Sequence, residues 1–148
     1  MKILIATDGS EFSDAAVEEC CRIITGPEGT QVKVMSTYHE VVPIDNFAQS
    51  AEYAKELEQK EHGHAEAIAG RAADRIRECH PGVEITEQVS VGAADRSIIE
   101  SAEEWGADLV VIGSHGRGFW GRLLVGSVTD AVVHHAPCSV LVVRKKSI

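Results

Sequence analysis

Residues 109–116 read Leu109-Val110-Val111-Ile112-Gly113-Ser114-His115-Gly116, an unbroken apolar run that ends in a glycine turn. Such a run predicts a β-strand that is covered on both faces, as in a parallel sheet between two layers of helices. A second run of this kind, at residues 3–6, ends at Asp8-Gly9-Ser10. We therefore expect both runs to be central strands of one sheet, with their glycine turns at the same edge.

Strands and helices are predicted to alternate along the rest of the chain. Short apolar runs predict the strands, and apolar stripes at helical spacing predict the helices, with Ser10 or Ser13 as the first cap. Residues 83–91 alternate between apolar and polar side chains, which suits a strand with one wet face at the edge of a sheet. The expected strands are 3–6, 32–35, 83–91, 109–112 and 140–143, and the expected helices are 10–24, 49–79, 95–105 and 126–135.

This alternation predicts the α/β fold class, with a single three-layer domain over residues 1–148 and helices on both faces of a five-stranded parallel sheet. The two fully apolar strands belong at the centre and the alternating strand at an edge. With the strands numbered along the chain, the order 3-2-1-4-5 fits these positions. Ligands of such sheets bind beyond the carboxyl ends of the strands, where the strand order reverses. The predicted site therefore lies at residues 8–10 and 113–116.

The composition is that of a globular protein with an acidic balance. Of 148 residues, 44% are hydrophobic and 25% are charged. There are 14 Lys and Arg and 23 Asp and Glu, which gives a net charge of −9. Without a basic run, nucleic acid and anionic membranes are not expected as partners. No apolar run approaches the roughly 20 residues that span a bilayer, and residues 1–6 are too short for a signal peptide. The four cysteines lack a C-x-x-C pattern, and we expect reduced thiols in the cytoplasm.

Two common nucleotide-binding patterns are met only in part. Gly116, Gly118 and Gly121 fit G-x-G-x-x-G, but no carboxylate follows at the required distance of roughly 20 residues. Residues 121–127 have the glycine spacing of a P-loop, but Ser127 stands where the phosphate-binding lysine belongs. We interpret the first match as chance and reject the second.

A third pattern, G-x2-G-x9-G-S, is complete in Gly113, Gly116, Gly126 and Ser127, after a buried strand and before a helix. In this pattern the chain resembles the ATP-binding subgroup of the universal stress protein family. The resemblance implies a cytoplasmic, dimeric stress-response protein that binds ATP. It covers the whole chain and includes residues 3–10, 108–116, 124–128 and 137–143.

The glycines of this pattern suit a phosphate site. They let the backbone approach phosphate oxygens and supply several N–H donors, and the helix after Gly126 adds its dipole, although they also serve as plain turn residues. An acidic protein can therefore still hold a triphosphate. The nucleotide-binding residues that the resemblance implies are Ala6, Thr7, Asp8, Thr37, Ile112, Gly113, Ser114, His115, Gly116, Arg117, Gly126, Ser127 and Val128.

The resemblance gives the residues on the base and ribose side particular roles. Ala6 and Thr7 would line the adenine side, and the backbone of Thr37, just past the second strand, would hydrogen-bond the base. The Asp8 carboxylate would meet the ribose or, through water, an Mg²⁺ ion on the phosphates. Alternatively, Asp8 is a turn or helix-capping aspartate.

The residues on the phosphate side also have two interpretations. The Ser127 hydroxyl would reach a phosphate, and with Asp130 it also forms an S-x-x-D pattern typical of a helix start. Arg117 and Arg122 would screen the phosphates, or they are solvated loop arginines. His115 lies in the same loop and is expected near the phosphates.

The chain shows no nucleophile, base and orienting group at readable spacing, apart from Asp8 and His115 as candidate bases. We therefore expect an ATP-binding regulatory module, in which bound nucleotide fixes the loop at residues 113–124 for a regulated protein to sense. One alternative is a slow ATPase or self-phosphorylating enzyme. A second alternative is a nucleotide-free, dimeric interaction protein.

The last predicted strand suggests a homodimer. In the order 3-2-1-4-5 this strand lies at an edge, yet it has no polar face before Arg144. An open apolar edge recruits other chains, and members of the family pair through this strand across a two-fold axis. Alternatively, a helix of the same chain covers the edge. The expected interface residues are Val140, Leu141, Val142 and Val143.

Overall fold

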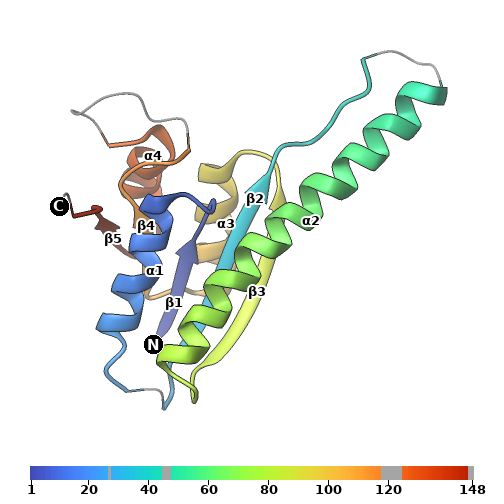
Figure 1. The fold of residues 1–148 in the computed structure, drawn as a ribbon. Coiled ribbons are helices and arrows are strands. Elements are labelled where there is room, and N and C mark those ends of the chain that lie inside the picture. Colours follow the sequence, from blue (N-terminus) through green and yellow to red (C-terminus); the bar gives the residue numbers. More distant parts are fainter. Residues whose placement is uncertain (27, 45–47, 118–124, 147–148) are drawn as a thin grey trace.

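A computed structural model describes residues 1–26, 28–44, 48–117 and 125–146 of the chain. Five parallel strands form one sheet in the order β3-β2-β1-β4-β5, with a helix on each crossover (Figure 1). The predicted fold class and strand order are confirmed. The elements are β1 (Lys2–Ala6), α1 (Glu11–Ile23), β2 (Gln31–Tyr38), α2 (Ala48–Cys79), β3 (Glu84–Val91), α3 (Ala94–Trp105), β4 (Leu109–Gly113), α4 (Ser127–His135) and β5 (Ser139–Val143).

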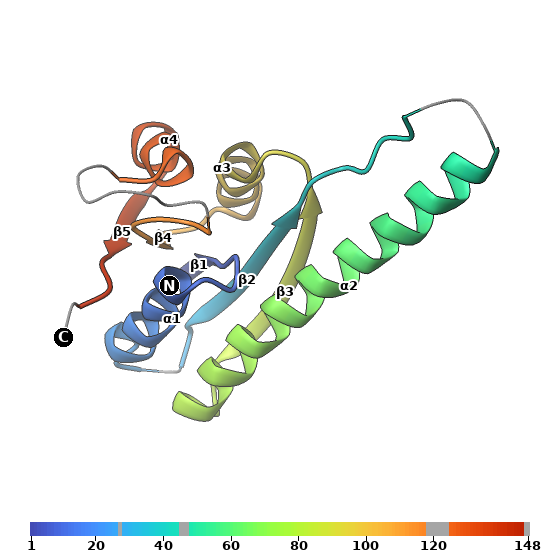
Figure 2. The ribbon, with the colours of Figure 1, turned by 45° about the horizontal axis from the view of Figure 1, so that its top comes forward.

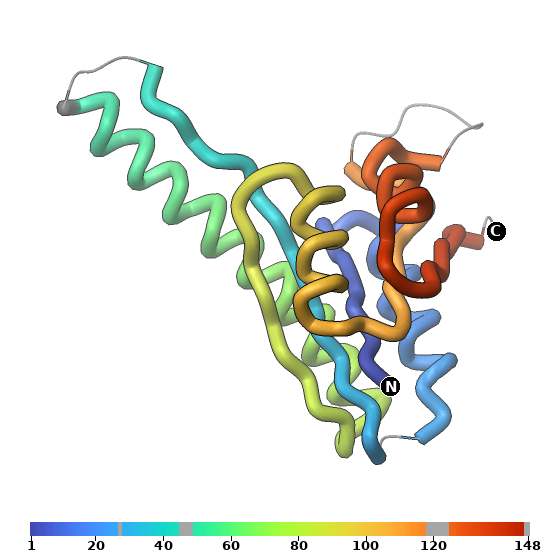
Figure 3. Tube along the Cα trace, turned by 180° about the vertical axis from the view of Figure 1, so that it is seen from behind, coloured from blue at the N-terminus to red at the C-terminus, as the bar shows by residue number. Residues whose placement is uncertain are grey.

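The sheet has a separate hydrophobic core on each face. Ile5 and Val111 pack with α1 and α2 on one face, and Leu4 and Val110 pack with α3 and α4 on the other. The two helical layers can be followed in the tilted view of Figure 2. Figure 3 shows the molecule from behind, with α3 and α4 in front of the sheet. Successive side chains of the central strands thus pack into opposite cores, which explains why β1 and β4 are apolar throughout.

Helix α2 is much longer than the strands that it covers. Its carboxyl-terminal half packs on the sheet through small and branched side chains such as Ala69, Ala73 and Ile76, which are fully buried. Its first turns project beyond the ends of the strands (Figure 1). Among the described residues, no helix is both long and apolar enough to cross a membrane.

Strand β2 is longer than predicted. The sequence pattern gave residues 32–35, but pairing with β3 is continuous from Gln31 to Tyr38. The polar side chains of Ser36 and Thr37 interrupt the apolar run, while their backbone groups continue the ladder. Thr37 therefore lies inside β2 and not just past it, and the prediction was wrong on this point.

Candidate functional site

A pocket of about 440 Å³ lies at the carboxyl ends of β1 and β4, where the strand order reverses. Every predicted nucleotide-binding residue except Ser114 lines this pocket. Ser114 is buried instead, and its hydroxyl lies 2.9 Å from Nδ1 of His115. The lining residues are Ala6, Thr7, Asp8, Ser13, Met35, Thr37, Ala94, Ile98, Ile112, Gly113, His115, Gly116, Arg117, Gly126, Ser127, Val128 and Thr129.

One side of the pocket is apolar. Ala6 and Ile112 come from the central strands, Met35 from β2 and Ile98 from α3, and all four belong to the core between the sheet and α3. Five lining residues were not predicted, namely Ser13, Met35, Ala94, Ile98 and Thr129. Ala94 and Ile98 belong to the site because α3 packs over the sheet. The predicted strand order would have revealed them, since it places α3 over the first two strands. The arrangement can accommodate a flat, weakly polar group.

The Asp8 carboxylate connects the two loops that border the pocket. Its Oδ1 accepts a hydrogen bond from the backbone N–H of Ser10 at 2.9 Å, and its Oδ2 accepts one from the backbone N–H of Arg117 at 3.0 Å. Asp8 is thus a turn aspartate, and it also lines the pocket. A Cβ atom on Gly116 would lie 3.0 Å from the same Oδ2, so this glycine leaves room for the carboxylate.

Gly113 has a structural role in addition to its place in the pocket. A Cβ atom here would lie 2.7 Å from the carbonyl carbon and oxygen of Phe12, in the first turn of α1. Its own carbonyl accepts a hydrogen bond from the Thr129 hydroxyl at 2.8 Å. The first glycine of the motif therefore allows α1, β4 and α4 to meet closely.

The amino terminus of α4 faces the pocket. Its N-cap is Gly126, which has no side chain to cap the helix. Asp130 donates its backbone N–H to the carbonyl of Gly126 at 2.8 Å. Ser127 is the first helical residue and provides no side-chain cap, so the S-x-x-D interpretation was wrong. The first N–H groups of a helix have no acceptor within it, and they are suited to hold an anion.

The backbone fixes both ends of the loop that joins β4 to α4. Gly126 donates its N–H to the carbonyl of Ser114 at 2.9 Å, and Ser114 donates its own N–H to the carbonyl of Val143 at 2.8 Å. A Cβ atom on Gly126 would lie 3.3 Å from the Cα of His115. Gly126 therefore packs directly against the first residues of this loop, and Ser114 among them is hydrogen-bonded to the end of β5.

Two charged or titratable side chains of the loop contact neighbouring helices. The ring of His115 lies 5.2 Å from that of Phe12 in α1. The Arg117 guanidinium lies over Gly9, and its Nη2 is 3.3 Å from Nε2 of His64 in α2. Arg117 is thus held against α2 rather than simply solvated. Arg122, Gly118 and Gly121 lie outside the described residues.

The fold and the site define a doubly wound α/β protein with a ligand pocket at the reversal of its strand order. The family described as "Universal stress protein family" matches residues 1–144, and the chain belongs to this family.

Individual relatives agree with this assignment. The chain is 31% identical over 149 residues to "Universal stress protein A homolog 2" of Coxiella burnetii, across 98% of this chain and 95% of that protein. The solved structure of the universal stress protein UspA from Lactobacillus plantarum has a TM-score of 0.81 at 25% identity, with 97% of each chain covered. A universal stress protein solved in complex with cAMP has a TM-score of 0.65 at 26% identity, covering 99% of this chain and 98% of that one.

Replacing Gly113 with Ala should destabilise the fold, because the new methyl group would clash with the backbone of Phe12. Overpacking of this kind lowers the free energy of unfolding by about 1–3 kcal/mol. The matched control is Gly63→Ala, in the interior of α2 with no atom within 4 Å of the added Cβ, which should raise it by about 0.5–1 kcal/mol. Urea unfolding of both variants measures the two changes, and equal stabilities would contradict the proposed packing role.

Proposed function

We propose that this pocket binds an adenine nucleotide, specifically ATP with Mg²⁺, and that the chain is a regulatory module of the stress response. Bound nucleotide would fix the conformation of the loop at residues 113–124, which a regulated protein then senses. One observation carries the proposal. A single pocket combines an apolar side with backbone left accessible by glycines and with the amino terminus of α4. This combination suits a ligand with a flat base at one end and phosphates at the other.

The apolar side would hold the adenine ring. Met35 and Ile98 would lie against its faces, and the backbone of Thr37 at the end of β2 would hydrogen-bond its edge. The relative solved with cAMP supports an adenine ring as the recognised group.

The phosphates would lie at the opposite side of the pocket. Gly116 and Gly126 expose backbone there, and Ser127 and Val128 offer the first N–H groups of α4, so a polyanion meets local donors despite the acidic net charge. The Ser127 hydroxyl is not used as a helix cap, which leaves it available to a phosphate oxygen.

Asp8 fits the role of an outer ligand to Mg²⁺. Each of its carboxylate oxygens accepts one N–H bond and retains a lone pair, and Mg²⁺ binds through carboxylates, water and substrate phosphates. Among the described residues, no three His, Cys, Asp or Glu side chains gather into a metal site. The ion would therefore arrive on the nucleotide, neutralise its phosphates, and meet Asp8 through water.

The free cysteines also suit a location in the cytoplasm, where thiols stay reduced. We therefore propose that the protein acts there.

Addition of millimolar ATP and Mg²⁺ should stabilise the protein. Ligand at 100 times its dissociation constant adds about 2.7 kcal/mol to the free energy of unfolding, which a thermal melt detects as a raised Tm. AMP and cAMP, tested beside ATP, report which phosphate chain the site prefers. No shift with any of the three would disprove the binding proposal.

A matched pair of variants locates the binding site. In Gly126→Val the side chain would meet the Cα of His115 and the carbonyl of Ser114, so the ATP-dependent shift should disappear. In the control Gly26→Val no atom lies within 4 Å of the added Cβ, and the shift should persist. Normal binding by Gly126→Val would show that the ligand sits elsewhere.

Purified protein should turn ATP over slowly, if at all. The two candidate bases are already engaged, Asp8 by two backbone N–H groups and His115 by the Ser114 hydroxyl. We expect fewer than about 1 turnover per second, at or below the low end of typical enzymes. Faster phosphate release that is lost in Asp8→Ala or His115→Ala would favour the alternative, an ATPase.

We also propose that the protein forms a homodimer through β5. This strand lies at the edge of the sheet, where its register pairs it with β4. Beside it, a shallow groove is lined by Val125, Val133, Val142 and Arg144, together with Asp130. Val133 of this groove is 49% exposed, and such an apolar edge is suited to a second copy of the chain.

Substitution of Val142 with Lys should convert the dimer into a monomer, because each copy would place a charge in the shared apolar edge. The matched control is Val42→Lys, since Val42 is 70% exposed and follows β2, which β1 and β4 separate from β5 in the sheet. Light scattering at micromolar concentration measures both masses. A monomeric wild type, or a Val142→Lys variant that stays dimeric, would exclude this interface.

A further inference from the structure

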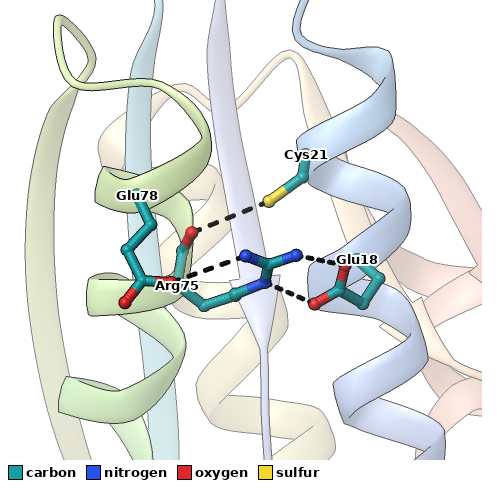
Figure 4. A network of polar contacts seen from close by, with 4 residues as sticks. All are labelled: Glu18, Cys21, Arg75 and Glu78. Atoms are coloured by element: carbon teal, nitrogen blue, oxygen red, sulfur yellow. Dashed lines mark hydrogen bonds and ion pairs between the residues drawn. The ribbon is translucent and has the colours of Figure 1, made fainter.

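The carboxyl-terminal ends of α1 and α2 lie side by side at the end of the sheet opposite the pocket (Figure 1). A network of polar contacts joins them (Figure 4), in which the Arg75 guanidinium donates from Nε and Nη2 to both carboxylate oxygens of Glu18. Arg75 holds the pKa of the Glu18 carboxyl below its usual value through this hydrogen bonding. This network joins the second half of α1 to the last turns of α2.

Cys21 of α1 belongs to this contact. Its Sγ points toward the carbonyl oxygen of Arg75 at 3.9 Å (Figure 4), and its own carbonyl lies 2.7 Å from Nε2 of His80. Arg75 is one helical turn before Cys79, and His80 is the residue after it. Cys21 thus contacts the residue one turn before Cys79 and the residue directly after it, which places Cys79 beside Cys21 across the contact between α1 and α2.

Accessibility separates this pair from Cys20, and position separates it from Cys138, which packs against the core on the other face of the sheet. Cys20 is fully buried in the core, whereas Cys21 and Cys79 are both partly exposed, so a small oxidant can reach them. Burial, together with Cys79, raises the pKa of the Cys21 thiol to about 12. At neutral pH Cys21 is therefore a thiol and not the reactive thiolate, so its own reaction with an oxidant is slow.

We propose that Cys21 and Cys79 are a redox-responsive pair that hydrogen peroxide converts into a disulfide between α1 and α2. Each thiol loses one proton and one electron, the sulfur atoms form one S–S bond, and one molecule of peroxide is reduced to two molecules of water. A thiol reductant reverses the step. The pair lies at the far end of the sheet from the pocket, so this site does not depend on the proposed nucleotide.

The test uses the full chain, reduced and then treated with hydrogen peroxide or with diamide, a thiol oxidant that accepts two hydrogen atoms. Thiols titrated after denaturation should fall from four to two per chain. Tryptic digestion without reductant should give one linked peptide pair, residues 3–22 with 78–96. The Tm of the oxidised protein should rise relative to the reduced protein, because the link joins residues that are distant in sequence.

Single variants identify the bonded sulfur atoms. Cys21→Ser and Cys79→Ser should each abolish the linked peptide, while Cys20→Ala and Cys138→Ser should retain it; circular dichroism confirms that each variant is folded. Four titratable thiols after both oxidants would overturn the proposal. A link that survives in Cys21→Ser but is lost in Cys20→Ala would also overturn it. Loss of ATP binding in Gly126→Val has no bearing on this result, so the two proposals fail independently.

Discussion

The pairing of β1 with β4 determines the architecture of this protein. Ile3, Leu4 and Ile5 lie in register with Leu109, Val110 and Val111, and nearly all of their side chains are fully buried. The chain builds outward from β1 through β2 and β3, and then returns to the other side of β1 to add β4 and β5. Helices α1 and α2 cover one face of the sheet, and α3 and α4 cover the other. The loop after β1 and the loop after β4 therefore lead to opposite faces, and the pocket lies between them.

The glycines of the sequence motif do not share one physical role. Gly113 lets the first turn of α1 approach β4, Gly116 leaves room for the Asp8 carboxylate, and Gly126 packs against the beginning of the loop. Their spacing is therefore constrained by how three elements fit together, independently of any ligand. The fold itself would still need the first of these glycines, whatever the pocket holds.

The sheet could be predicted from the sequence because its signals are local. The apolar run at residues 109–112 and the alternation at residues 83–91 depend only on which faces are covered, and they gave the strand order correctly. The end of β2 was missed, and so were Met35 and Ile98 on the apolar side of the pocket, whereas Ala6 and Ile112 on the same side were predicted. Thr37 is held in a strand by its backbone partner on β3, and Ile98 reaches the pocket because α3 packs over the sheet, so neither position shows in the local pattern.

The projecting start of α2 affects how the molecule moves through solution. A compact chain of this length has a radius of gyration of roughly 15 Å, but a helical arm beyond the sheet adds friction without adding mass. Elution from a sizing column would therefore resemble that of a larger globular particle. Hydrodynamic radius alone is a poor measure of copy number for this protein, and methods that report mass directly are needed to count its subunits.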